Sequence, residues 1–167
     1  DPKYAPLIVK LSDWITKSRD DRQGLRDEVR GHVVTAWSST NYSKGIRYAW
    51  AVHTGMIVAP MARFAAVVRS DKTLKARWEA DADRLLKIAQ EAVSVHDDEF
   101  REGPGADEGY VYCPYLKKHL PLNMQNALAR AWLAIDDATK TPKHRERVIR
   151  LARFLKNRLR PMEDGSY

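Results

Sequence analysis

Side chains able to do chemistry gather in residues 109–130, which read GYVYCPYLKKHLPLNMQNALAR. Phenol, imidazole, amide and guanidinium groups follow one another at short intervals there, namely Tyr110, Tyr112, Tyr115, His119, Asn123, Asn126 and Arg130. Tyrosine and histidine can move a proton, and arginine can pair with a carboxylate through two parallel hydrogen bonds. The stretch therefore suits the floor of a site for a polar ligand.

The same stretch predicts a tyrosine-rich loop that enters a helix at Pro121, a residue whose fixed φ suits a first turn. Asn123, Asn126 and Arg130 follow at i, i+3 and i+7, so they share one stripe of that helix. The neighbouring stripe is apolar and must pack: Leu128, Ala131 and Ile135. The alternative to a ligand site is a helix start at which Asn123 hydrogen-bonds the local backbone.

A second group of candidates surrounds His53, which precedes Thr54 and Gly55. Trp50 lies about one turn earlier, so its indole face could stack on a sugar ring while the imidazole moves a proton. The alternative is that His53 only packs or caps a helix start. His96 lies on an apolar stripe and is expected to be a core histidine. The run of His96, Asp97, Asp98 and Glu99 is not expected to bind a metal, because neighbouring residues of a helix point in different directions. No cofactor is predicted.

Length and composition point to one globular domain over residues 1–167, with 44% hydrophobic and 31% charged residues. No apolar run is expected to span a membrane, so no membrane partner is predicted. Cys113 is the single cysteine and cannot form an internal disulfide. A chain that begins at Asp1 suits a processed secreted or periplasmic protein, although trimming would give the same start.

The net charge of +7 is concentrated near the end of the chain. Nine cations stand there against Glu146 alone, namely Lys140, Lys143, Arg145, Arg147, Arg150, Arg153, Lys156, Arg158 and Arg160. A basic helix can attract nucleic acid, anionic lipid or acidic polysaccharide. It can equally be the solvated outer face of a helix.

Apolar residues recur every three or four positions along most of the chain, which predicts an all-α fold. The expected helices cover residues 5–18, 20–37, 46–68, 70–101, 121–139 and 141–160. The third is expected to break at a turn around Thr54 and Gly55 and to resume with Pro60 in its first turn. Residues 102–109 are the clearest loop. Short connections predict antiparallel helical hairpins with negligible strand content.

Four segments carry a resemblance: AWAVHTGM (49–56), ARFA (62–65), LPLNMQNALARA (120–131) and LARFL (151–155). They resemble helical hairpins of the (α/α) toroid of six-hairpin glycosidases, polysaccharide lyases and related sugar-active proteins. A complete toroid needs about twice as many helices, by the usual length of a helix and its loop. The chain would then form an arc with uncovered apolar residues such as Leu7, Ile8 and Leu11. This predicts a homodimer or a further chain segment as partner.

The resemblance implies an activity on carbohydrate, for which two reactions are open. Hydrolysis needs paired carboxylates across a sugar, and the candidates are Asp97, Asp98, Asp107 and Glu108. A uronate lyase instead needs a group that neutralises a carboxylate and a Tyr or His that removes the α-proton. The residue types present fit the lyase reaction better than hydrolysis, and a basic chain suits an acidic polysaccharide.

The resulting assignment has two parts. The catalytic candidates are His53, Tyr110, His119 and Asn123, and the substrate-binding candidates are Trp50, Tyr112, Asn126 and Arg130. The alternative is a non-catalytic module that binds acidic polysaccharide or nucleic acid through the basic last helix.

Overall fold

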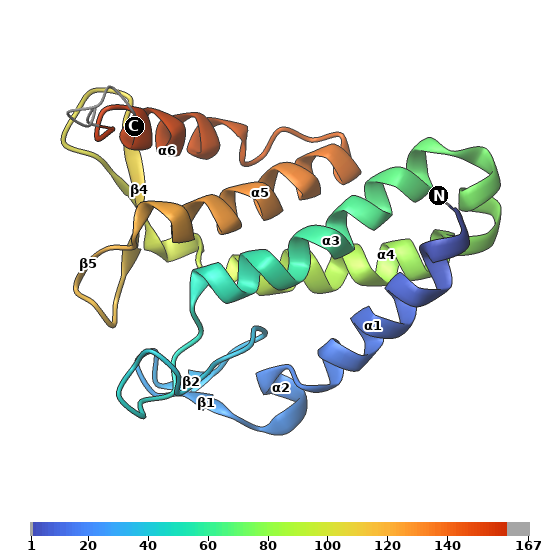
Figure 1. Ribbon diagram of the computed structural model, residues 1–167, viewed down its shortest axis with the longest axis horizontal. Coiled ribbons are helices and arrows are strands. Elements are labelled where there is room, and N and C mark those ends of the chain that lie inside the picture. The colour runs from blue at the N-terminus through green and yellow to red at the C-terminus, as the bar shows by residue number, and fades with distance from the viewer. Residues whose placement is uncertain (1, 160–167) are drawn as a thin grey trace, which may run out of the picture.

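The computed structural model describes residues 2–159 and is mostly helical, which confirms the all-α class at the coarse level (Figure 1). Its α-helices are α1 (Ala5–Lys17), α2 (Asp20–Gln23), α3 (Ala51–Ser70), α4 (Lys72–Ser94), α5 (Leu122–Thr139) and α6 (Arg145–Lys156). Two 3-10 turns cover Pro2–Tyr4 and Asp97–Glu99. The strands are β1 (Arg26–Asp27), β2 (His32–Val33), β3 (Phe100–Glu102), β4 (Gly109–Cys113) and β5 (Lys118–His119).

The centre of the molecule is α3, which packs against both α4 and α5 (Figure 1). Helices α3 and α4 form an antiparallel hairpin joined at Asp71, whose side chain accepts hydrogen bonds from Thr73 N and Leu74 N, as an N-cap does. Helix α5 runs parallel to α3, because Gly55 lies against Ala127 near their starts and Arg69 Nη1 donates to Ala138 O near their ends. Helix α6 returns along α5 as a second hairpin.

One hydrophobic cluster forms the core, and it includes Leu85, Val93, Leu128, Ala131 and Leu151. Leu155 is only half-buried, and Phe154 takes the buried position on α6. The last helix also begins later than expected, at Arg145. Asp136 holds the preceding turn because its carboxylate accepts from both the backbone N and the Nδ1 of His144.

The expected break at Thr54 and Gly55 is wrong, since α3 is one continuous helix of 20 residues with Pro60 inside it. The expectation that no apolar run could span a membrane is also too strict. By length and composition α3 could cross one, with a mean hydropathy of 1.5 over its most apolar window. More than half of that window is buried by the surrounding protein, as in the core helix of a globular domain.

The helix expected over residues 20–37 is wrong. Helix α2 ends at Gln23 because Gly24 adopts a left-handed φ of 66°. A short antiparallel pair, β1–β2, follows. The buried carboxylate of Asp27 holds the turn by accepting hydrogen bonds from the backbone of Val29 and Arg30. A carboxylate that binds its own following backbone favours a turn over a helix.

Negligible strand content is likewise wrong, because residues 100–119 form a three-stranded antiparallel sheet in the order β3–β4–β5. Helix α4 ends at Ser94, before the residue expected. The supposed tyrosine loop is strand β4, which buries Gly109, Val111 and Cys113 and leaves Tyr110 and Tyr112 half-exposed. That alternation is the period of a half-buried strand.

Candidate functional site

The parallel course of α3 and α5 places their first turns at the same end of the molecule. His53 lies in the first turn of α3, and Asn123 in that of α5. Asn123, Asn126 and Arg130 are all exposed along one stripe of α5, as their spacing predicts. Strands β4 and β5 lead directly into this end of α5 (Figure 1). Residues distant in sequence are thus collected at one end of a helix pair.

A cleft of about 330 Å³ lies between α3 and α5, and we refer to it as the α3–α5 cleft. It is lined by Gly55, Met56, Ala59, Pro60, Arg63, Ala127 and Arg130. Small residues let the two helices approach closely, whereas Arg63 and Arg130 are exposed and carry charge. Within residues 2–159 neither arginine has an ion-pair partner. The cleft is therefore equipped for an anion.

Arg63 was not among the sequence candidates, although a signal for it was present. His53, Met56, Pro60 and Arg63 step by three or four residues, so they share a stripe of α3. That stripe becomes visible only when residues 51–70 are read as one helix. The expected turn at Gly55 concealed it.

His53 is half-buried, and this burial lowers the pKa of its imidazole. A histidine with a lowered pKa is neutral at pH 7 and can accept a proton. Its ring centroid lies 6.3 Å from that of Tyr42, whose side chain is 81% exposed. Tyr42 therefore offers an open aromatic face beside the imidazole.

Trp50, expected to stack on a sugar, is 4% exposed. Its indole packs edge-on against Tyr48, with ring centroids 4.9 Å apart, and against Tyr115, at 5.6 Å. Its Nε1 is buried and has no hydrogen-bond partner among the described residues. In this arrangement the indole supports the start of α3, and its faces are not open to a ligand.

The remaining candidates form separate contacts. Tyr110 and His119 lie together, with ring centroids 6.3 Å apart, and both pack against Phe154 of α6. The guanidinium of Arg101 lies over the ring of Tyr112. None of these side chains lines the α3–α5 cleft. The structure thus pairs Tyr110 with His119 on the β-sheet, away from Arg63 and Arg130 of the cleft.

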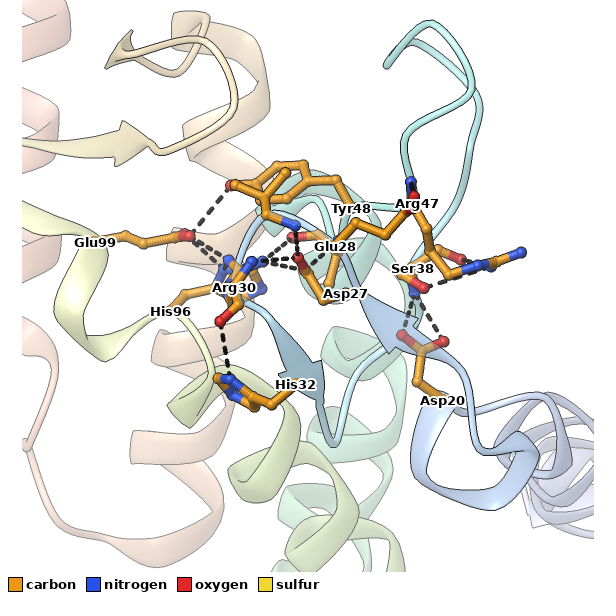
Figure 2. Close-up of polar contacts among 12 residues, drawn as sticks. Asp20, Asp27, Glu28, Arg30, His32, Ser38, Arg47, Tyr48, His96 and Glu99 are labelled. Carbon is orange, nitrogen blue, oxygen red and sulfur yellow. Dashed lines mark hydrogen bonds and ion pairs between the residues drawn. The ribbon is translucent and has the colours of Figure 1, made fainter.

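A buried polar network, which the sequence did not predict, joins residues 27–48 to residues 96–99 (Figure 2). Arg30 is its centre. Its guanidinium pairs with Asp27 at 2.5 Å, pairs with Glu99, and lies over the ring of Tyr48. The hydroxyl of Tyr48 donates to Glu99, and burial raises the pKa of that hydroxyl, so it stays protonated as a donor. The network ties residues 27–48 to the helices.

His96 completes this network and is a fully buried core histidine, as expected. Its Nδ1 lies 2.7 Å from Glu99 Oε2, and its Nε2 lies 2.9 Å from Thr54 Oγ1. The order Thr54–His96–Glu99 has the connectivity of a nucleophile, a base and an orienting carboxylate. All three side chains are at most 6% exposed, however, so a substrate has no approach to them. The arrangement is structural.

Several arginines on the basic face of α6 are paired with carboxylates. Arg147 pairs with Asp97 at 2.7 Å, and three further pairs follow along the helix and just beyond it: Arg150–Glu102, Arg153–Asp107 and Arg158–Glu108. Arg160 lies outside the described residues. Three carboxylates proposed for hydrolysis, those of Asp97, Asp107 and Glu108, are therefore engaged by arginines.

Glu108 is a poor general acid for a second reason. Hydrogen bonds from Asn157 and then from Arg158 lower the pKa of its carboxyl. A general acid must hold its proton near neutral pH, which requires a raised pKa. Among residues 2–159, no group of three or more His, Cys, Asp or Glu side chains is placed to hold a metal ion.

Comparison with known proteins finds no matching family model, no matching curated protein and no matching solved structure.

Proposed function

We propose that this protein binds an acidic, uronate-containing oligosaccharide in the α3–α5 cleft. The supporting observation is that Arg63 and Arg130 line one cleft and have no ion-pair partner within residues 2–159. A guanidinium matches a carboxylate with two parallel hydrogen bonds, so two of them favour a ligand that carries repeated carboxylates.

Neutral groups near the cleft fit the sugar part of such a ligand. Asn123 and Asn126 continue the exposed stripe that ends at Arg130, and amides can both donate to and accept from hydroxyl groups. Asn123 and Arg130 are separated by about 10 Å along the helix axis, at 1.5 Å per residue. The exposed ring of Tyr42 lies beside His53 at the same end. A stripe of this length favours an oligomer over a single sugar.

The proposal includes lyase-type processing at His53. A neutral imidazole would accept the proton at C5 of the uronate while Asn123 stabilises the carboxylate of that residue, and the arginines would bind carboxylates farther along the oligomer. The electron pair of the C–H bond would form the C4–C5 double bond, and the C4–O bond would break with its oxygen taking up a proton. Tyr110 and His119 lie on the β-sheet outside the cleft, so that proton would come from solvent water. The relation to (α/α) toroid proteins stays part of this proposal, supported by the two successive hairpins α3–α4 and α5–α6.

Calorimetric titration tests the binding site. The parent protein and the variants Arg63→Gln and Arg130→Gln would be titrated with a galacturonate trimer and with a neutral trisaccharide. Each variant should weaken trimer binding about fivefold, because a partly exposed ion pair contributes about 1 kcal/mol. Binding of the neutral sugar should change less. Arg145→Gln on α6 is the control, because it removes the same charge away from the cleft.

The second candidate function, polyanion binding through α6, is tested with duplex DNA in the same titrations. The pairing of the α6 arginines with acidic residues argues against it. If the two cleft variants bind the trimer like the parent while Arg145→Gln loses DNA in a salt-dependent manner, the sugar proposal is wrong. Lyase chemistry has its own readout, the ultraviolet absorbance of the unsaturated product, which His53→Gln should abolish.

A further inference from the structure

A second cleft lies where the start of α1 meets α3 and α4, and it shares Pro60 and Arg63 with the α3–α5 cleft. We refer to it as the α1–α3 groove. It has a volume of about 320 Å³, and its walls include Ile8, Phe64, Val67 and Leu74. Val67 is 54% exposed, so the groove presents apolar surface directly to solvent. Exposed apolar concavities of this kind usually mark a binding site.

One charge borders this apolar surface. Arg63 is the only charged residue among the described residues that line the groove, and its guanidinium has no ion-pair partner within residues 2–159. A ligand that satisfies both features must combine an apolar body with an anionic end. A purely apolar ligand would leave the cation unused, and a purely polar anion would leave the apolar walls in water.

We propose that the α1–α3 groove binds a single-chain fatty carboxylate, with the alkyl chain along α3 and the carboxylate at Arg63. At about 30 Å³ for each water-sized group, the volume accommodates roughly ten such groups, which corresponds to a chain of medium length. Two further apolar side chains, Tyr4 just before α1 and Leu11 within it, are each about half-exposed and lie one turn before and after Ile8. They extend the apolar surface beyond the groove.

A chain-length series tests the apolar part of this proposal. Hexanoate, octanoate and decanoate would each be titrated calorimetrically into the full chain, below their critical micelle concentrations. Affinity should rise up to about fourfold for each methylene that enters the groove. It should level off in longer homologues once the groove is full. Equal affinity across the three ligands would overturn the proposal.

Two variants locate the site. Val67→Glu places a carboxylate on the groove wall at an exposed position, so decanoate binding should fall at least tenfold while the circular dichroism spectrum is unchanged. Ile149→Glu is the matched control, because Ile149 is 38% exposed on α6, away from the groove. It should bind decanoate like the parent. Equal binding by the parent and Val67→Glu would refute the site.

Arg63→Gln tests the anionic part. It should weaken decanoate about fivefold and leave decanol unchanged, and equal effects on both ligands would refute a carboxylate at Arg63. The sugar proposal can be tested separately with Arg130→Gln, because Arg130 lines the α3–α5 cleft and does not line the α1–α3 groove. That variant should bind decanoate like the parent even though it loses galacturonate. A loss of decanoate binding in Arg130→Gln would also count against a separate groove.

Discussion

Gly55 of α3 and Ala127 of α5 are in direct backbone contact. A Cβ atom placed on Gly55 would lie 2.3 Å from the carbonyl carbon of Ala127, closer than real Cβ contacts ever come. The missing side chain therefore lets two parallel helices touch through their backbones. This contact brings the first turns of α3 and α5 together and fixes the floor of the α3–α5 cleft.

Replacing Gly55 with Ala should destabilise the protein. Helix propensity alone would favour Ala by about 1 kcal/mol, whereas forcing the two backbones apart should cost about 1–3 kcal/mol or more. The sign of the change therefore reports whether the close contact exists. Denaturant titration gives the free energy of unfolding. A more stable Gly55→Ala variant would show that α3 and α5 do not touch here.

Breaking the buried network should be costly. In Glu99→Gln the guanidinium of Arg30 loses one of its two carboxylate partners while its side chain is 11% exposed. The free energy of unfolding should fall by about 3 kcal/mol, since a buried charge without full compensation is strongly destabilising. Asp13→Asn is the matched control, because Asp13 pairs with Arg84 in solvent and should contribute at most about 1 kcal/mol. Similar losses in both variants would contradict the assigned burial of the network.

The lowered pKa of His53 predicts a pH dependence of stability. Below about pH 6.5 the unfolded chain binds a proton at this histidine, whereas the folded chain does so only at lower pH. The free energy of unfolding should therefore fall as the pH drops through this window. The difference between the parent and His53→Gln isolates the contribution of this residue. An identical pH profile for the two proteins would mean that His53 is not perturbed by burial.

The outer face of α1 predicts association. Tyr4, Leu7, Leu11 and Trp14 recur every three or four residues and are 52%, 50%, 54% and 69% exposed, so they form an apolar stripe. This agrees with the uncovered surface expected of an incomplete arc, for which a homodimer or a further helical segment was predicted. Sedimentation equilibrium should show self-association that the double change Leu7→Lys and Leu11→Lys removes. A clean monomer at every concentration would rule out the homodimer.

Local sequence was sufficient wherever a single element determines its own structure. The stripes of α1, α4 and α5 predict those helices, because a 3.6-residue period with a cap such as Asp71 needs no distant partner. The exposure of Asn123, Asn126 and Arg130 follows from the same period. His96 on an apolar stripe likewise predicts a buried histidine.

Only the tertiary structure shows which local structure is adopted where contacts between distant residues determine it. Gly55 reads as a turn from local propensity, but close packing against Ala127 keeps it inside a helix. Residues 26–33 have a helical apolar pattern, yet the buried carboxylate of Asp27 and the ion pair between Arg30 and Glu99 hold them as a hairpin. Burial of this kind outweighs the small differences in helix propensity.

The candidate sites divide in the same way. Residue types alone nominate Arg130 and His53 as candidates, because the chemistry of a side chain does not depend on the fold. Arg63 joined Arg130 only because α3 is unbroken and parallel to α5, which no local pattern encodes. Trp50 is not an exposed ring, because Tyr48 and Tyr115 pack against it. The exposed ring beside His53 is that of Tyr42. The sequence determines which chemical groups are present, but their exposure and their distances from one another depend on how the helices and loops pack.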